Sequence, residues 1–111
     1  MEMNMKNKDL NILIVEDEIV ASEYIKSILL GFGFSNIFEA SSFDEALEVV
    51  RATEIELVFM DINIEGSIDG INSAKILNEE YFLPIIYTTA FEDSQTIEEA
   101  SETNIFGYII K

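Results

Sequence analysis

The sequence predicts an α/β fold in which five parallel strands alternate with helices and form one doubly wound sheet. Two observations lead to this prediction. Five short apolar runs recur along the 111 residues, and segments with a helical spacing of apolar residues lie between them. Short β-rich runs without polar alternation are typical of parallel strands that are buried on both faces. Strict alternation with short connections implies right-handed crossovers, which place helices on both faces of the sheet.

The apolar runs give the expected strands, which cover residues 12–15, 37–40, 57–60, 85–88 and 108–110. The second run is the weakest, because Glu39 follows its two apolar residues, and we expect it at an edge of the sheet. Pro84 precedes the fourth run, where its missing N–H costs least. Five strands of this kind commonly take the order 2-1-3-4-5, which is the flavodoxin-like arrangement.

Helices are expected between consecutive strands. The first helix places its apolar residues on one face: Val20, Tyr24, Ile25, Ile28 and Leu29. Gly31 or Gly33 ends this helix. The second helix begins at a capping box in residues 42–45. The third covers residues 70–78, and a fourth with fewer core positions is expected at residues 94–103.

Composition and charge restrict the chemistry of the chain. It contains 22 Asp and Glu against six Lys and Arg, which gives a net charge of −16. This charge disfavours direct binding to nucleic acid or to an anionic membrane, and it suits cations or a basic face of another protein. Cysteine and histidine are absent. Their absence excludes disulfides, thiolate zinc sites and histidine as a general base.

The length of the chain fits one domain. We assign residues 11–111 to this domain and residues 1–10 to a polar N-terminal extension. The extension lacks the apolar core of a signal peptide, and no apolar run reaches the ~18 residues of a membrane-spanning helix. We therefore expect a soluble, cytoplasmic protein.

Polar residues follow the predicted strands at the edge of the sheet where doubly wound folds bind ligands. Glu16 and Asp17 follow the first strand, Asp61 the third, Thr89 the fourth and Lys111 the fifth. Neighbouring acids repel and raise one another's pKa values, and a divalent cation relieves this repulsion. Because all candidate ligands are oxygen atoms, Mg²⁺ is the favoured ion. A carboxylate nucleophile, Mg²⁺, a lysine and a hydroxyl are the groups needed to form an acyl phosphate.

Each of these residues also has a simpler explanation. Glu16 and Asp17 could belong to a solvated acidic loop, Thr89 could only end a strand, and Lys111 could be a frayed chain end. Asp61 is harder to explain in this way, because an unpaired carboxylate at the end of the most buried strand would be costly.

Five segments, in order along the chain, resemble the signature motifs of response-regulator receiver domains: residues 12–18, 58–61, 69–70, 87–90 and 107–111. The similarity extends from about residue 11 to the last residue. It implies that Asp61 is the phosphoacceptor. It also implies that Glu16 and Asp17 hold Mg²⁺ through their side chains, directly or (for Glu16) through water, and that the backbone carbonyl of Asn63 is a further ligand.

The same resemblance assigns roles to three more residues. Lys111 would pair with the phosphoryl oxygens, Thr89 would donate its hydroxyl to the phosphoryl group, and Tyr108 would be an aromatic switch that turns inward behind Thr89. Tyr108 could also be a strand aromatic that packs against a helix. The phosphoryl donor would be a phosphohistidine on a sensor histidine kinase or a phosphotransfer protein. The chain would be a phosphoacceptor switch rather than an enzyme.

The chain departs from the family pattern at three places. The loop at residues 63–70 is one residue longer than usual and lacks its usual proline. Phe91 lies at a position that tunes dephosphorylation in the family, and we expect Phe91 and Asn63 to shape water access to the acyl phosphate. The chain also ends at Lys111, before the fifth helix of the family. We therefore expect a truncated domain with an exposed apolar patch on the first helix and the sheet, which a homodimer could cover.

Other functions fit the sequence less well. A Mg²⁺-dependent aspartyl phosphatase would place Asp-x-Asp after the first strand, where this chain has adjacent acids. A flavin or nucleotide binder would need a Gly- or Ser/Thr-rich phosphate loop at that position. A receiver-like interaction module that no longer accepts phosphate stays an open alternative.

Overall fold

The computed structural model describes residues 9–64, 66, 68–89 and 105–110. Within this part of the chain, strands and helices follow one another as β1 (Asn11–Val15), α2 (Ile19–Gly31), β2 (Asn36–Ala40), α3 (Phe43–Ala52), β3 (Leu57–Asp61), α4 (Gly70–Tyr81), β4 (Ile85–Thr89) and β5 (Ile105–Ile110). None of the described helices is long and apolar enough to cross a membrane. The helix expected at residues 94–103 lies outside the described residues, as do Phe91 and Lys111.

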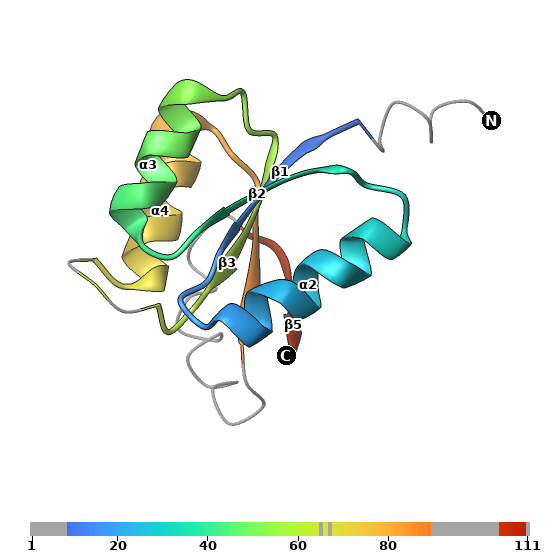
Figure 1. Ribbon diagram of the computed structural model, residues 1–111. Coiled ribbons are helices and arrows are strands. Elements are labelled where there is room, and N and C mark those ends of the chain that lie inside the picture. Colours follow the sequence, from blue (N-terminus) through green and yellow to red (C-terminus); the bar gives the residue numbers. More distant parts are fainter. Residues whose placement is uncertain (1–8, 65, 67, 90–104, 111) are drawn as a thin grey trace.

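The strands form one parallel sheet in the order β2-β1-β3-β4-β5. This order confirms the prediction, including the edge position of the second strand. Helices α3 and α4 cover one face of the sheet and α2 lies on the other (Figure 1). Strand β5 begins at Ile105, three residues earlier than expected, because Gly107 interrupts the apolar pattern of the sequence at that point.

Alternating residues of the strands divide the core into two layers. On β1, Leu13 and Val15 pack with residues of α3 and α4, whereas Ile12 and Ile14 pack with residues of α2. All four side chains are fully buried. The sheet is therefore covered on both faces, as continuous apolar runs predict.

Helix α2 buries only part of the face that the sequence predicts for it. Ile25 and Leu29 are buried together with Ser22, but Val20 is 83% exposed and Tyr24 is 56% exposed. The buried residues follow the i, i+3, i+7 spacing of one helical stripe. Apolar residues surround most of this helix, so the sequence pattern does not distinguish the stripe that meets the sheet from the one beside it. Val20 and Tyr24 instead belong to the exposed apolar patch that the sequence predicts on this helix.

The start of α3 follows the predicted capping box with one change. The Ser42 hydroxyl accepts a hydrogen bond from the Glu45 N–H at 3.2 Å, which makes Ser42 the N-cap. The Glu45 carboxylate accepts from the N–H of Ser41 at 2.9 Å, one residue before the position that a standard box would use. Both contacts satisfy backbone donors near the start of the helix.

Helix α4 is longer than predicted. Asp69 caps its start by accepting a hydrogen bond from the Asn72 N–H at 2.8 Å. The helix continues to Tyr81 and ends at Phe82, which has a left-handed φ of 58°. A left-handed residue is the usual end of a helix, but glycine or asparagine normally occupies it. The sequence signal for this helix end was therefore absent.

Candidate metal centre

The predicted site residues of β1 and β3 converge at the carboxyl edge of the sheet. The two strands are neighbours, with Val15 opposite Met60, so that Glu16 and Asp61 leave the sheet side by side. Carboxylate oxygens of Glu16, Asp17 and Asp61 all lie within 4.8 Å of one another. Glu16 is 4% exposed and Asp61 is 3% exposed, whereas Asp17 is open to solvent.

Backbone contacts fix the two buried acids. The N–H of Glu16 donates to the carbonyl of Ala40 at 2.9 Å, which extends the pairing of β1 with β2 by one residue. The Glu16 carboxylate accepts from the Glu18 N–H at 3.2 Å, and the Asp61 carboxylate accepts from the Asn63 N–H at 3.1 Å. These bonds restrict the rotation of both carboxylates, so the cluster is preorganised.

The loop after β3 is anchored on both sides of Asn63. Ile62 and Ile64 are buried in the core layer of α3 and α4, while Asn63 is exposed between them. The Ile64 N–H donates to the carbonyl of Asp61 at 3.3 Å and closes a tight turn. The unusual loop therefore starts from a defined position beside Asp61.

Gly70 belongs to the 69–70 segment that resembles a family motif, and the structure shows why this position requires glycine. A Cβ atom at Gly70 would overlap the carbonyl oxygen of Asp61 and would lie 2.7 Å from the carbonyl oxygen of Ile62. Only glycine permits this close approach of backbone to backbone. The signal that could have found it is a glycine at the first position of a helix, directly after the capping residue Asp69.

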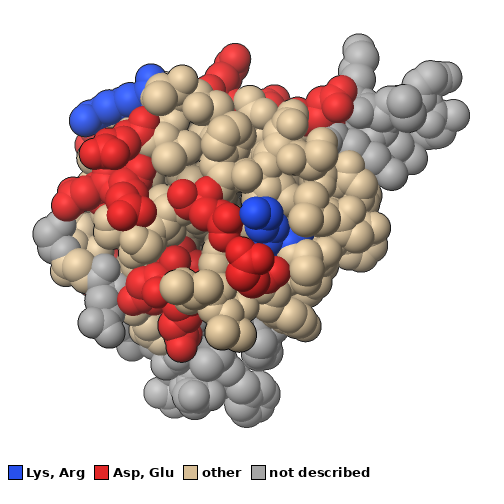
Figure 2. Space-filling model, viewed as in Figure 1, with Lys and Arg blue, Asp and Glu red and all other residues tan. Residues whose placement is uncertain are grey.

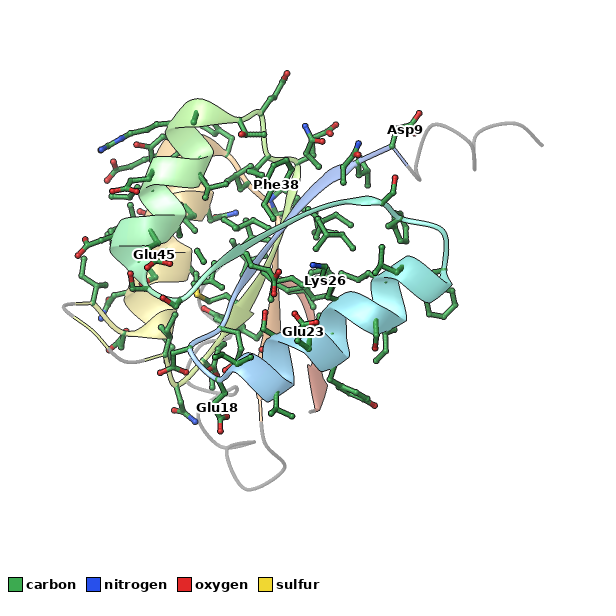
Figure 3. The ribbon with its side chains drawn as sticks, in the orientation of Figure 1. Asp9, Glu18, Glu23, Lys26, Phe38 and Glu45 are labelled. Atoms are coloured by element: carbon green, nitrogen blue, oxygen red, sulfur yellow. The ribbon has the colours of Figure 1, made fainter. Side chains whose placement is uncertain are left out.

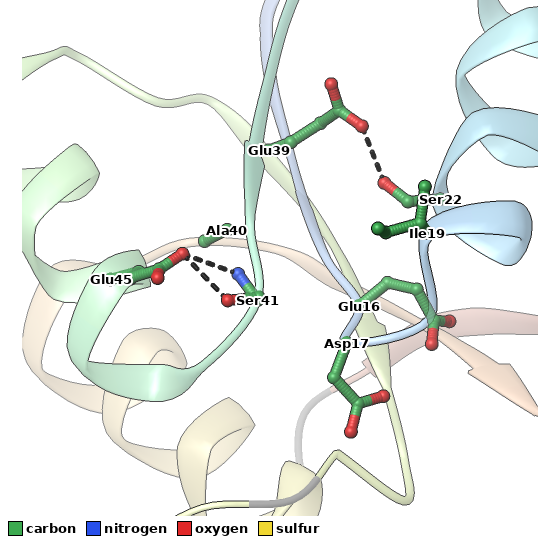
Figure 4. A pocket seen from close by; sticks show the side chains of 8 residues that line it. All are labelled: Glu16, Asp17, Ile19, Ser22, Glu39, Ala40, Ser41 and Glu45. Carbon is green, nitrogen blue, oxygen red and sulfur yellow. Dashed lines mark hydrogen bonds between the residues drawn. The ribbon is translucent and has the colours of Figure 1, made fainter.

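A hollow of about 250 Å³ lies next to the acidic cluster, between α2 and the start of α3 (Figure 4). Its lining includes Glu16, Asp17 and Glu39. Ser22 donates to the Glu39 carboxylate at 2.7 Å, and Lys26 lies 3.3 Å from the same group. Lys26 extends from α2 toward β2 (Figure 3). The hydrogen bond from Ser22, with help from Lys26, holds the pKa of Glu39 below its usual value.

The donor set fits a hard divalent cation. One carboxylate oxygen from each of the three residues lies within 4.8 Å of the others. The cluster therefore provides only oxygen ligands and a strongly negative charge. Mg²⁺ prefers oxygen ligands and is commonly bound by one or two carboxylates together with water. Acidic side chains are also frequent over the visible face of the molecule, where Lys and Arg are few (Figure 2). The surroundings of the site therefore favour cations.

Of the remaining predicted residues, Thr89 and Tyr108 are placed only through their backbone. Thr89 is the last residue of β4, and Tyr108 pairs with Tyr87 in the register of β4 and β5. Asp61 pairs with Thr88, so the end of β4 lies at the same edge as the acidic cluster. The side chains of Thr89 and Tyr108, and Lys111 as a whole, lie outside the described part of the structure.

The family described as the response regulator receiver domain matches residues 12–111. The chain belongs to this family. The chemotaxis protein CheY-3 of Vibrio cholerae is 32% identical over 107 residues, which cover 95% of this chain and 82% of that protein. Receiver domains generally act as phosphoacceptor switches under the control of histidine kinases or phosphotransfer proteins.

Two further similarities show how widely the domain is used. The transcriptional regulatory protein ZraR of Escherichia coli K12 is 33% identical over 110 residues, which cover 96% of this receiver domain but 24% of ZraR. The crystal structure of the signal receiver domain of a modulated diguanylate cyclase from Desulfovibrio desulfuricans G20 has a TM-score of 0.82 at 31% identity, covering 93% of this chain and 82% of that one. The family membership therefore specifies the receiver domain and not its output.

Proposed function

We propose that this receiver domain accepts a phosphoryl group on Asp61 in a Mg²⁺-dependent reaction. The observation that carries the proposal is the cluster of Glu16, Asp17 and Asp61, whose carboxylate oxygens lie within 4.8 Å of one another at the carboxyl edge of the sheet. The donor would be a phosphohistidine on a sensor histidine kinase or a phosphotransfer protein. The switch would operate in the cytoplasm, with residues 11–111 as the receiver domain.

The chemistry follows from the geometry of Asp61. A carboxylate oxygen of Asp61 attacks the phosphorus atom, the P–N bond of the donor breaks, and the imidazole leaves with the bonding electrons and takes up a proton. The hydrogen bond from the Asn63 N–H orients the carboxylate for this attack. Glu16, Asp17, Asp61 and the Asn63 carbonyl would hold Mg²⁺, which supplies positive charge opposite the phosphoryl oxygens.

The response to phosphorylation would involve β4 and β5. The phosphoryl group adds about −1.5 to −2 charges, which Lys111 would pair with and Thr89 would contact through its hydroxyl. A hydrogen bond to a charged group contributes about 1.5–3 kcal/mol. Inverting a 1:99 equilibrium takes about 5.5 kcal/mol. These contacts can therefore shift the equilibrium between two arrangements of β4 and Tyr108 substantially. They need not convert the whole population to the second arrangement.

Acetyl phosphate with Mg²⁺ tests the proposal directly. Intact-mass spectrometry should detect the gain of one phosphoryl group in the native protein and none in Asp61→Asn. Chelation of Mg²⁺ should abolish the gain as well. Equal phosphorylation of Asp61→Asn would show that the acceptor is another residue. A native protein that gains no mass, from acetyl phosphate or from a phosphorylated histidine donor, would favour the interaction module that no longer accepts phosphate.

A further inference from the structure

Thr88 carries a buried hydroxyl that the proposed phosphoacceptor reaction does not use. The residue is 1% exposed, and its Oγ1 makes no hydrogen bond to any residue that the structure describes. Buried polar groups nearly always have a partner, and one without a partner disfavours the state in which it occurs. The Thr88 hydroxyl is therefore available to donate to an acceptor that another state of the site supplies.

The register of the sheet places Thr88 beside the phosphoacceptor. Thr88 on β4 pairs with Asp61 on β3, and the Ile62 N–H donates to the carbonyl of Thr88 at 3.1 Å. Two residues earlier in each strand, Phe59 pairs with Ile86, and both pack into the core layer of α2. Because side chains two apart in a strand share a face, Asp61 and Thr88 also share a face.

We propose that the Thr88 hydroxyl gains its hydrogen-bond acceptor when Asp61 is phosphorylated. This inference rests on the proposed function. An aspartyl phosphate brings new, strongly accepting oxygens to the residue that pairs with Thr88. Rotation of the Thr88 side chain then satisfies the hydroxyl. Thr88 is thus a second hydroxyl donor, distinct from Thr89, and it favours the phosphorylated state both by its bond there and by its missing bond beforehand.

Thr88→Val tests this inference because valine keeps the shape of threonine and removes the hydroxyl. The probe is beryllium fluoride with Mg²⁺, a stable mimic of the phosphoryl group. Without the mimic, the urea midpoint of Thr88→Val should equal or exceed that of the native protein. Its affinity for the mimic should fall roughly 10- to 100-fold, which corresponds to one hydrogen bond to a charged group. Thr88→Ser, which keeps a hydroxyl, should retain most of this affinity.

Thr53→Val is the matched control, because Thr53 follows α3 at the opposite edge of the sheet. It should bind the mimic like the native protein.

A lower urea midpoint for Thr88→Val without the mimic would mean that the hydroxyl already has a partner, and it would overturn the inference. If Thr88→Val and the native protein bind the mimic with equal affinity, this inference is wrong, but the proposed function still stands. A native protein that neither binds the mimic nor gains mass from acetyl phosphate would overturn the proposed function too. Should Thr88→Val give too little folded protein, Thr88→Ala carries the comparison of affinity for the mimic, but not that of the urea midpoint, because the lost methyl group lowers the midpoint in any case.

Discussion

Gly70→Ala should disrupt the site although Gly70 has no functional group. The new Cβ would overlap the carbonyl oxygen of Asp61 and would lie 2.7 Å and 2.8 Å from the carbonyl oxygen and carbon of Ile62. These neighbours are backbone atoms of a buried strand end, so they cannot rotate away as a flexible side chain would. Overpacking of this kind costs about 1–3 kcal/mol. We expect a loss near the upper limit, about 3 kcal/mol, because three backbone atoms must move together.

The displacement should also reach the acidic cluster, because the carbonyl that must move belongs to Asp61. We therefore expect weaker Mg²⁺ binding and slower phosphorylation by acetyl phosphate, in addition to a lower urea midpoint measured by circular dichroism. Gly31→Ala is the control. A Cβ at Gly31, the last residue of α2, meets nothing within 4 Å, and its stability should change by no more than about 1 kcal/mol. If the two variants behave alike, the close packing inferred at Gly70 is wrong.

Further predictions concern the charges and the helix ends. Glu16→Gln and Asp17→Asn should each weaken Mg²⁺ binding about tenfold or more in a calorimetric titration, and unchanged affinity would exclude the residue as a ligand. Because the pKa of Glu39 is lowered in the folded state, its contribution is present above the unfolded value of 4.5 and is lost as the pH falls through the folded value. The stability difference between the native protein and Ser22→Ala should therefore shrink below pH 4.5 in urea titrations, and a constant difference would refute this linkage. Phe82→Gly should raise the urea midpoint, because Phe82 has a left-handed φ of 58° and is 85% exposed. Relief of that conformation gives at most about 1 kcal/mol, and a lower midpoint would show that the Phe82 ring stabilises the fold.

The parts of the fold that depend on simple periodicity could be predicted from the sequence. Continuous apolar runs determine strands buried on both faces, and alternation of strands with helices leaves few topologies. The strand order then brings Glu16 and Asp61 to one edge, because β1 and β3 are neighbours in that order. The convergence of the acidic cluster thus follows from residue types and topology alone.

Features that depend on tertiary contact could not be predicted in this way. The sequence shows that α2 is apolar, but only the packed sheet determines that Ile25 is buried and Tyr24 is exposed. Similarly, the close approach at Gly70 is a contact between a helix start and a strand end that are nine residues apart. The missing hydrogen-bond partner of the Thr88 hydroxyl could not be predicted either. Residues with hydroxyl groups are common near strand ends, and their partners depend on the neighbouring strand.

The contacts around Asp61 indicate the direction in which the proposed phosphorylation would act. On one side, the backbone of Asp61 is in direct contact with Gly70, and there is no space for the strand end to move toward α4. On the other side, the Ile62 N–H connects the strand end to Thr88, whose hydroxyl has no partner among the described residues. A tightly packed contact resists displacement, whereas an unsatisfied hydroxyl gains free energy by moving to an acceptor. New charge at Asp61 should therefore change the end of β4 more than the start of α4.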